Sequence, residues 1–142
     1  MAHRILIATS RYYEHISREL EAGALEALAG EDVVTEVIEV PGAFEVPGII
    51  AMAADSGQYD GYIALGCVIR GETSHYDYVC GESARGLMDL AVERRLAIGY
   101  GILTVENEAQ ALARADRTQK NKGKDAAEAC IAMLKMRKKF VR

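Results

Sequence analysis

The sequence predicts an α/β fold in which helices cover both faces of a four-stranded parallel sheet. One observation and one general rule carry this prediction. Four short apolar runs alternate with longer segments of helical periodicity along the chain. Strands that alternate with helices are joined by right-handed crossovers, which make the strands parallel. Because 142 residues is close to the commonest domain size, we expect one domain over residues 1–142.

The first half of the chain contains three of the predicted strands. Residues 4–9 form a short apolar run, and a helical pattern follows it until a glycine ends it. The β-branched run at 33–40 predicts the second strand, and a helix is expected from about Phe44 to Ser56. Residues 62–69 are apolar apart from one glycine, as in a strand that is buried on both faces.

The second half completes the alternation. A third helix is predicted over 76–95, and the apolar run at 97–103 predicts the fourth strand. Two closing helices are expected at 107–115 and 125–139. The turn Asn121-Lys122-Gly123 is predicted to separate them.

Composition excludes several function classes. A net charge of -4 argues against sequence-independent binding of nucleic acid, which requires a basic surface. The cysteines Cys67, Cys80 and Cys130 lack C-x-x-C spacing, so neither a disulfide framework nor a zinc site is expected. The apolar runs are too short for the core of a signal peptide or for a membrane span. We therefore expect a cytoplasmic protein.

Polar and glycine-containing segments follow each predicted strand. In an open parallel sheet, ligands bind beyond the carboxyl ends of the strands. The sequence therefore predicts that these segments all lie at the same edge of the sheet, where a ligand is expected to bind. The segments are 10–13, 41–45, 67–75 and 104–107.

The turn between the third strand and the third helix has the features of an anion site. Backbone N–H groups and the helix dipole would favour a phosphate near Gly71, Glu72 and Thr73. The alternative is that Thr73 and Ser74 only cap the helix, since the turn lacks the full glycine pattern of a P-loop. His75 at the same helix start is a candidate base, although a lone histidine is more often a structural hydrogen-bonding residue.

Other candidates also have a functional and a structural interpretation. Glu45 lies between the two prolines of the chain, where it could bind ligand hydroxyls or simply begin a helix. Tyr12 and Tyr13 could stack on a flat heterocycle or pack in the core. A basic stretch could hold a phosphate or form a solvated surface; its members are Arg114, Arg117, Lys120, Lys122 and Lys124.

Four motifs, in this order and at these separations, resemble the lumazine synthase family. They are PGAFEVP at 41–47, ALGCVIRGETSHYDYVCGES at 64–83, GILTVENEAQA at 101–111 and the NKG turn at 121–123. The resemblance covers nearly the whole chain. It implies a flavodoxin-like, doubly wound three-layer sandwich with a four-stranded parallel sheet, assembled into homopentamers with active sites between subunits.

The resemblance also implies a reaction in riboflavin biosynthesis. The substrates would be 5-amino-6-(D-ribitylamino)uracil and 3,4-dihydroxy-2-butanone 4-phosphate, and the product 6,7-dimethyl-8-ribityllumazine. His75 would transfer protons, and Arg114 of a neighbouring subunit would bind the substrate phosphate. No metal or organic cofactor is implied. The other implied contacts are Glu72 and Thr73 at the phosphate, Ala43, Phe44 and Glu45 at the ribityl chain, Cys67, Val68 and Ile69 at the pyrimidine, Tyr12 as the stacking ring, Tyr100 in the adjacent subunit's pocket, and Lys122 of the NKG turn.

The chain departs from the family pattern at two positions. Tyr12-Tyr13 stands where many members have phenylalanine or tryptophan followed by asparagine, so stacking is retained and one polar contact is in doubt. Cys67 replaces a common threonine, which matters little if that position is read through its backbone.

Two further interpretations belong to other function classes. The same pocket could hold a flavin or lumazine without turnover, or the chain could be a structural shell protein, since family members also form capsids of sixty subunits. The joint presence of His75, Arg114 and the phosphate turn favours an enzyme over a binding protein. Because the first predicted strand begins almost at the start of the sequence, we expect a pentamer rather than a shell.

Overall fold

A computed structural model describes residues 2–141 and contains a four-stranded parallel sheet in the order β2-β1-β3-β4. Every strand is within two residues of its predicted bounds, and the expected α/β fold with a four-stranded parallel sheet is confirmed. The strands are β1 His3–Ser10, β2 Val33–Val40, β3 Gly61–Ile69 and β4 Ala97–Val105.

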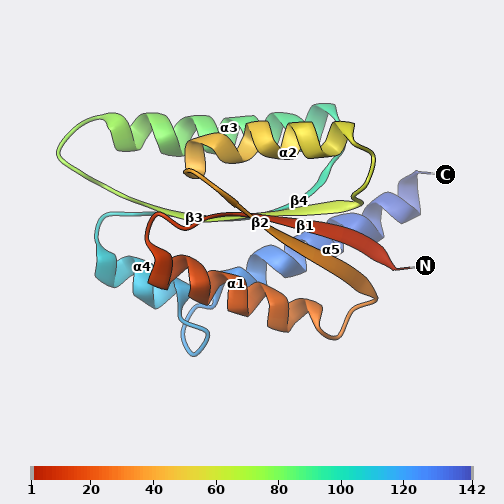
Figure 1. Ribbon diagram of the computed structural model, residues 1–142, viewed down its shortest axis with the longest axis horizontal. Helices are drawn as coiled ribbons and strands as arrows, with labels where there is room; N and C mark the ends of the chain where they lie inside the picture. Colours follow the sequence, from red (N-terminus) through yellow and green to blue (C-terminus); the bar gives the residue numbers. More distant parts are fainter. Residues whose placement is uncertain (1, 142) are drawn as a thin grey trace.

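Helices cover both faces of this sheet and make three layers (Figure 1). One face is covered by α1 Glu14–Leu28, α4 Glu108–Ala115 and α5 Lys122–Phe140. The other is covered by α2 Val46–Asp55, which follows the short 3-10 turn η1 Ala43–Glu45, and by α3 His75–Glu93. Both ends of the described chain lie at the amino edge of the sheet, which leaves the carboxyl edge to the loops that follow the strands.

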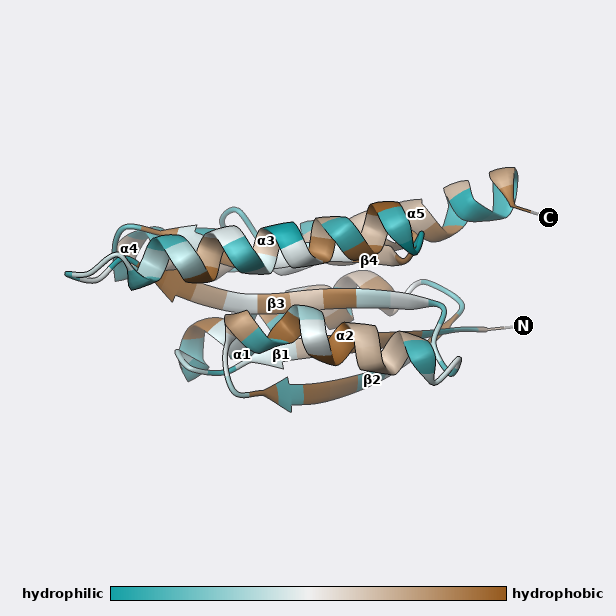
Figure 2. Ribbon diagram, turned by 90° about the horizontal axis from the view of Figure 1, so that it is seen from above, coloured by the Kyte–Doolittle hydropathy of each residue, from teal (hydrophilic) through white to brown (hydrophobic). Residues whose placement is uncertain are grey.

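The alternation of side chains along β1 explains the two cores. Ile5 and Ile7 are fully buried against α1, α4 and α5, whereas Leu6 and Ala8 are buried against α2 and α3. Successive side chains of a strand point to opposite faces, so a continuous apolar run fills both layers. Hydrophobic colour is concentrated in the strands and in stripes along the helices (Figure 2). No helix within residues 2–141 has the length and apolar character needed to cross a membrane.

Glycines allow α5 to pack directly on β4 and α1. A Cβ added to Gly99 of β4 would collide with the carbonyl oxygen of Ala126, and one added to Gly123 would collide with the carbonyl oxygen of Leu20 in α1. Both obstacles are backbone atoms, so no side-chain rotation could relieve the collision. The first contact determines how near α5 lies to the sheet, and the second how near it lies to α1.

The predicted Asn121-Lys122-Gly123 turn is wrong in its position. Lys122 already begins α5 and Gly123 lies in its first turn, so residues 116–121 make the connection between α4 and α5. Asn121 has the left-handed conformation, with φ of 46°, and immediately precedes the helix. The contact of Gly123 with α1 is a long-range one, and for this reason helix propensity did not place it correctly.

Candidate active site

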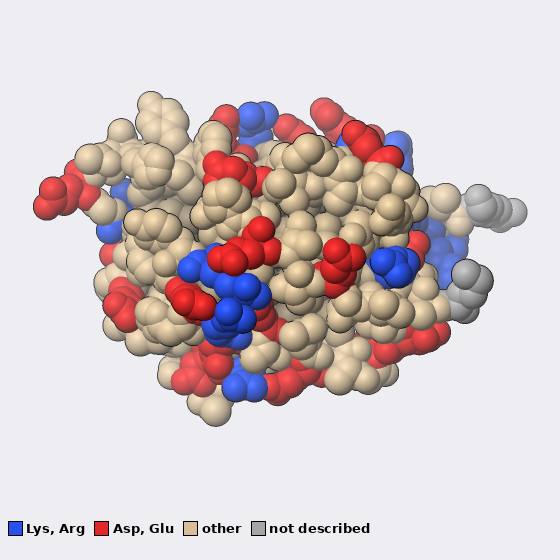
Figure 3. Space-filling view, viewed as in Figure 1, with Lys and Arg blue, Asp and Glu red and all other residues tan. Residues whose placement is uncertain are grey.

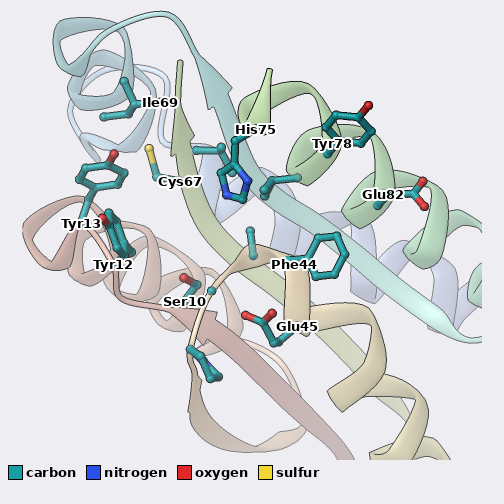
Figure 4. A pocket seen from close by; sticks show the side chains of 15 residues that line it. Ser10, Tyr12, Tyr13, Phe44, Glu45, Cys67, Ile69, His75, Tyr78 and Glu82 are labelled. Atoms are coloured by element: carbon teal, nitrogen blue, oxygen red, sulfur yellow. The ribbon is translucent and has the colours of Figure 1, made fainter. Parts of the chain in front are cut away.

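A cleft of about 800 Å³ opens at the carboxyl edge of the sheet, beyond the ends of β1, β2 and β3. This is the edge predicted from the sequence. Three of the four predicted segments line it, together with the first two turns of α3 (Figure 4). The fourth segment, 104–107, does not line the cleft, because β4 is at the far edge of the sheet. It does follow β4 at the predicted carboxyl edge of the sheet.

The loop after β1 contributes an exposed aromatic ring. The side chain of Tyr12 is 77% exposed, and Tyr13 is partly buried against the core. Their ring centroids lie 5.0 Å apart in an edge-on arrangement. Tyr13 therefore supports the Tyr12 ring from the side and leaves a face of Tyr12 free to stack on a flat ligand.

A buried ion pair holds this loop in place. Arg11 donates from Nε and Nη2 to the two carboxylate oxygens of Glu21 in α1, each at 2.8 Å, and the Thr9 hydroxyl donates to Glu21 at 2.9 Å. Burial raises the pKa of the Glu21 carboxyl, but the hydrogen bonds from Arg11 and Thr9 outweigh burial and lower the pKa below its ordinary value. Glu21 is therefore ionised at neutral pH and holds the loop after β1 through Arg11 and Thr9.

The depressed pKa of Glu21 predicts how stability depends on pH. A carboxyl whose folded pKa is lowered stabilises the fold fully above its ordinary pKa, near 4.5, and loses that contribution as the pH falls through the lower folded value. Urea unfolding at a series of pH values measures this. The free energy of unfolding of wild type should exceed that of Glu21→Gln at neutral pH, and the difference should shrink below about pH 4.5. A constant difference between the two proteins down to about pH 3 would contradict this.

The segment after β2 supplies an apolar ring and a carboxylate. Phe44 is 54% exposed and Ala43 is buried beneath it. Glu45 directly precedes α2 but makes no capping hydrogen bond with its side chain, and its carboxylate is at the cleft (Figure 4). Glu45 therefore starts the helix and also lines the cleft, and its binding of ligand hydroxyls stays a prediction. Pro47 packs on Gly86 of α3 and fixes the two helices against each other.

The end of β3 forms the floor of the cleft. Cys67 is buried, and burial raises the pKa of its thiol to about 12. The thiol stays protonated at neutral pH, so Cys67 is not a nucleophile. Val68 and Ile69 continue the floor toward the turn that precedes α3.

The turn at 70–74 is exposed and is held by side chains around it. Thr73 Oγ1 accepts a hydrogen bond from the His75 backbone N–H at 3.3 Å, whereas the Ser74 side chain does not cap α3. Arg70 Nε donates to Glu106 at 3.0 Å, and its guanidinium lies 4.3 Å from the Tyr76 ring centroid. Thr73 therefore has the local capping role proposed for it, while its position in the turn still allows contact with an anion.

His75, the candidate base, lies at the start of α3 and faces the cleft (Figure 4). Tyr78, Val79 and Glu82 line the cleft from the same helix, at spacings of three, four and seven residues. None of these three residues was predicted from the sequence as part of the site. Helical periodicity counted from His75 is the signal that would have found them.

Known proteins match this chain over nearly its whole length. Residues 2–138 match the family model described as 6,7-dimethyl-8-ribityllumazine synthase. This chain belongs to that family. Proteins of the same name are 56% identical in Sphingopyxis alaskensis, with 99% of this chain and 98% of the relative aligned, and 55% identical in Erythrobacter litoralis, with 96% and 97% aligned. A third, from Methylobacterium radiotolerans, is 56% identical over 95% of this chain and 82% of the relative.

The remaining residues expected from the lumazine synthase family lie outside the cleft of a single chain. Glu72 and Thr73 are in the exposed turn beside it. Tyr100 is on β4 under α3, Arg114 donates to the carbonyl oxygen of Gln110 in α4, and Lys122 pairs with Asp125 at 3.3 Å. Within residues 2–141, the residues that line the cleft include the carboxylates Glu45 and Glu82 but no lysine or arginine. The described lining of one chain therefore supplies neither of these side chains to a phosphate.

The charge pattern elsewhere is mixed. On the face seen in Figure 3, lysines and arginines lie among aspartates and glutamates and form no continuous basic surface. Within residues 2–141, no group of three or more His, Cys, Asp or Glu side chains is arranged to hold a metal ion. The residues that line the cleft of this lumazine synthase family member supply imidazole, carboxylate, phenol and backbone groups.

Proposed function

We propose that this chain, an enzyme of riboflavin biosynthesis, joins 5-amino-6-(D-ribitylamino)uracil to 3,4-dihydroxy-2-butanone 4-phosphate in the cleft and releases 6,7-dimethyl-8-ribityllumazine, phosphate and water. The observation that carries the proposal is the convergence of an aromatic ring, a carboxylate and an imidazole from three separate segments at one edge of the sheet. These are Tyr12, Glu45 and His75. An aromatic ring can stack on a flat substrate, a carboxylate can accept hydrogen bonds from its hydroxyls, and an imidazole can transfer protons at its reacting amine.

The aminouracil occupies the deeper part of the cleft. Tyr12 stacks on its pyrimidine ring, and the backbone of Cys67, Val68 and Ile69 provides polar groups to the ring edge. The ribityl hydroxyls lie along 43–45, where the Glu45 carboxylate accepts hydrogen bonds from them. A neutral polyol suits a wall that carries carboxylates and no cations.

His75 transfers protons during the condensation. The free amine of the uracil attacks the ketone, and loss of water gives an imine. Phosphate then leaves by elimination, and the ribitylamino nitrogen adds to the remaining carbonyl and closes the ring with loss of a second water. The His75 imidazole faces this part of the cleft, where it accepts and returns protons as bonds to nitrogen and oxygen change.

The phosphate binds at the turn before α3. Glu72 and Thr73 offer backbone N–H groups and a hydroxyl next to the positive end of the helix dipole. The cation comes from Arg114 of a neighbouring subunit, because Arg114 is on α4 and outside the cleft of its own chain. Tyr100 and Lys122 complete the site from the neighbour in the same way.

Arg114→Ala should raise the KM for the keto-phosphate with a smaller change in the KM for the aminouracil. Loss of a charge-assisted contact to phosphate corresponds to about 1.5–3 kcal/mol, or roughly 10- to 100-fold in KM. Steady-state kinetics with each substrate varied in turn measures this. Arg18→Ala, which removes an exposed arginine paired with Glu14, is the control. An unchanged KM for the keto-phosphate would remove Arg114 from the site.

The active assembly is a homopentamer. Large apolar side chains are exposed on α2 and α3, namely Met52, Tyr78, Met88 and Val92. Such a surface favours burial against other copies of the chain, and this burial would bring neighbouring residues to the cleft. Analytical ultracentrifugation should give the mass of five chains, and the mass of a sixty-subunit shell would overturn the pentamer.

The free cysteines Cys67, Cys80 and Cys130 suit the reducing cytoplasm, where we place the enzyme.

The decisive experiment mixes the purified protein with both substrates and follows lumazine absorbance and fluorescence against a protein-free control. Product formation that depends on the protein supports the enzyme. Tight binding of lumazine or flavin without acceleration would instead make the chain a binding protein.

A further inference from the structure

We propose that Arg11 is a positioning residue that sets the distance between the two walls of the aminouracil subsite. This inference rests on the proposed function, because it concerns the aromatic wall at Tyr12 and the polyol wall at 41–45. Arg11 does not line the cleft itself. It acts through the two segments that it joins.

The first link is to the aromatic wall. Arg11 lies between Ser10 and Tyr12, which both line the cleft. Its guanidinium makes two hydrogen bonds of 2.8 Å with Glu21, whose side chain is 8% exposed. The Ser17 hydroxyl also donates to the Ser10 carbonyl oxygen at 2.5 Å. The backbone on either side of Arg11 is therefore fixed against α1.

The second link is to the polyol wall. Arg11 Nη1 lies 3.6 Å from the Glu39 carboxylate of β2. Glu39 is paired with Thr9 in the parallel ladder, and Pro41 follows it by two residues. Phe44 and Glu45 are thus joined through the short segment 40–43 to a carboxylate that pairs with Arg11. One guanidinium connects both walls below the cleft.

The chemistry of this connection requires arginine. A planar guanidinium can give two parallel hydrogen bonds to Glu21 and still direct a third nitrogen toward Glu39. A lysine ammonium retains the charge but cannot hold both carboxylates in that geometry. The two arms also differ in burial, since the Glu21 side chain is 8% exposed and the Glu39 side chain 59%. The Glu39 arm can therefore be removed with little effect on folding.

The test compares Arg11→Lys and Glu39→Gln with wild type in the assembled protein. Both variants should raise the KM and the calorimetric Kd for the aminouracil, by roughly 10-fold for Arg11→Lys, because small displacements of positioning groups are costly. The effect of Glu39→Gln should be smaller, about 2- to 5-fold, as for an exposed ion pair. The KM for the keto-phosphate should stay near the wild-type value. Asp55→Gln is the control, since Asp55 pairs with Arg94 at the other end of α2.

An aminouracil KM and Kd in Glu39→Gln equal to those of Asp55→Gln would overturn the proposal, as would equal increases in the KM of both substrates. If Arg11→Lys does not fold, Glu39→Gln alone decides. If wild type binds the aminouracil but forms no lumazine, the proposed function fails, and the Kd values still decide the role of Arg11. Absence of aminouracil binding to wild type would overturn both.

Discussion

His75→Ala should lower kcat by ~10²–10⁴-fold and leave a measurable residual activity. The size follows from the loss of a general acid-base group at the reacting atoms. The residual activity follows from the cleft itself, because holding two substrates together makes their encounter intramolecular, whatever residue occupies position 75. Single-turnover measurement of lumazine formation, with binding of the aminouracil determined separately, would establish both parts of this expectation.

The matched control for this variant is His15→Ala. His15 is also an exposed histidine near the carboxyl edge, but it pairs with Glu108 at 3.0 Å and does not line the cleft. Its replacement should leave kcat near the wild-type value. Complete loss of turnover in His75→Ala, with assembly and substrate binding intact, would mean that positioning contributes nothing by itself. Equal effects of the two substitutions would remove His75 from the chemistry.

Gly99→Ala should destabilise the fold by about 3 kcal/mol, at the upper end of the range for overpacked cores. The added methyl group would collide with the Ala126 carbonyl oxygen, so α5 must move away from β4. This movement would loosen the packing of α5 on Gly61, where Cys130 and Leu134 lie close to the strand. Urea unfolding followed by circular dichroism measures the loss.

Gly30→Ala provides a comparison of opposite sign. Gly30 is exposed beyond the end of α1, its φ is not positive, and a Cβ added there would have nothing within 4 Å. Alanine should therefore stabilise the protein by about 0.5–1 kcal/mol, because it reduces the freedom of the unfolded chain. If both substitutions changed stability by the same amount, close packing of α5 would not be the reason for glycine at position 99.

Several parts of the site could be predicted from the sequence because they depend on local pattern and on one general rule. Apolar runs located the four strands within two residues, since burial on both faces leaves a continuous hydrophobic signal. The rule that ligands bind at the carboxyl edge of parallel strands then brought Tyr12, Glu45 and His75 to one place. Four ordered motifs indicated the family, which the comparisons confirm.

Other features were decided only by the tertiary structure, because they depend on contacts between residues distant in sequence. Strand order placed β4 at the far edge and thereby kept 104–107 out of the cleft. Packing of Gly123 on α1 extended α5 to Lys122 and moved the preceding turn. The link from Arg11 to both Glu21 and Glu39 has no local signal at all, since three elements must first assemble before one guanidinium can reach two carboxylates.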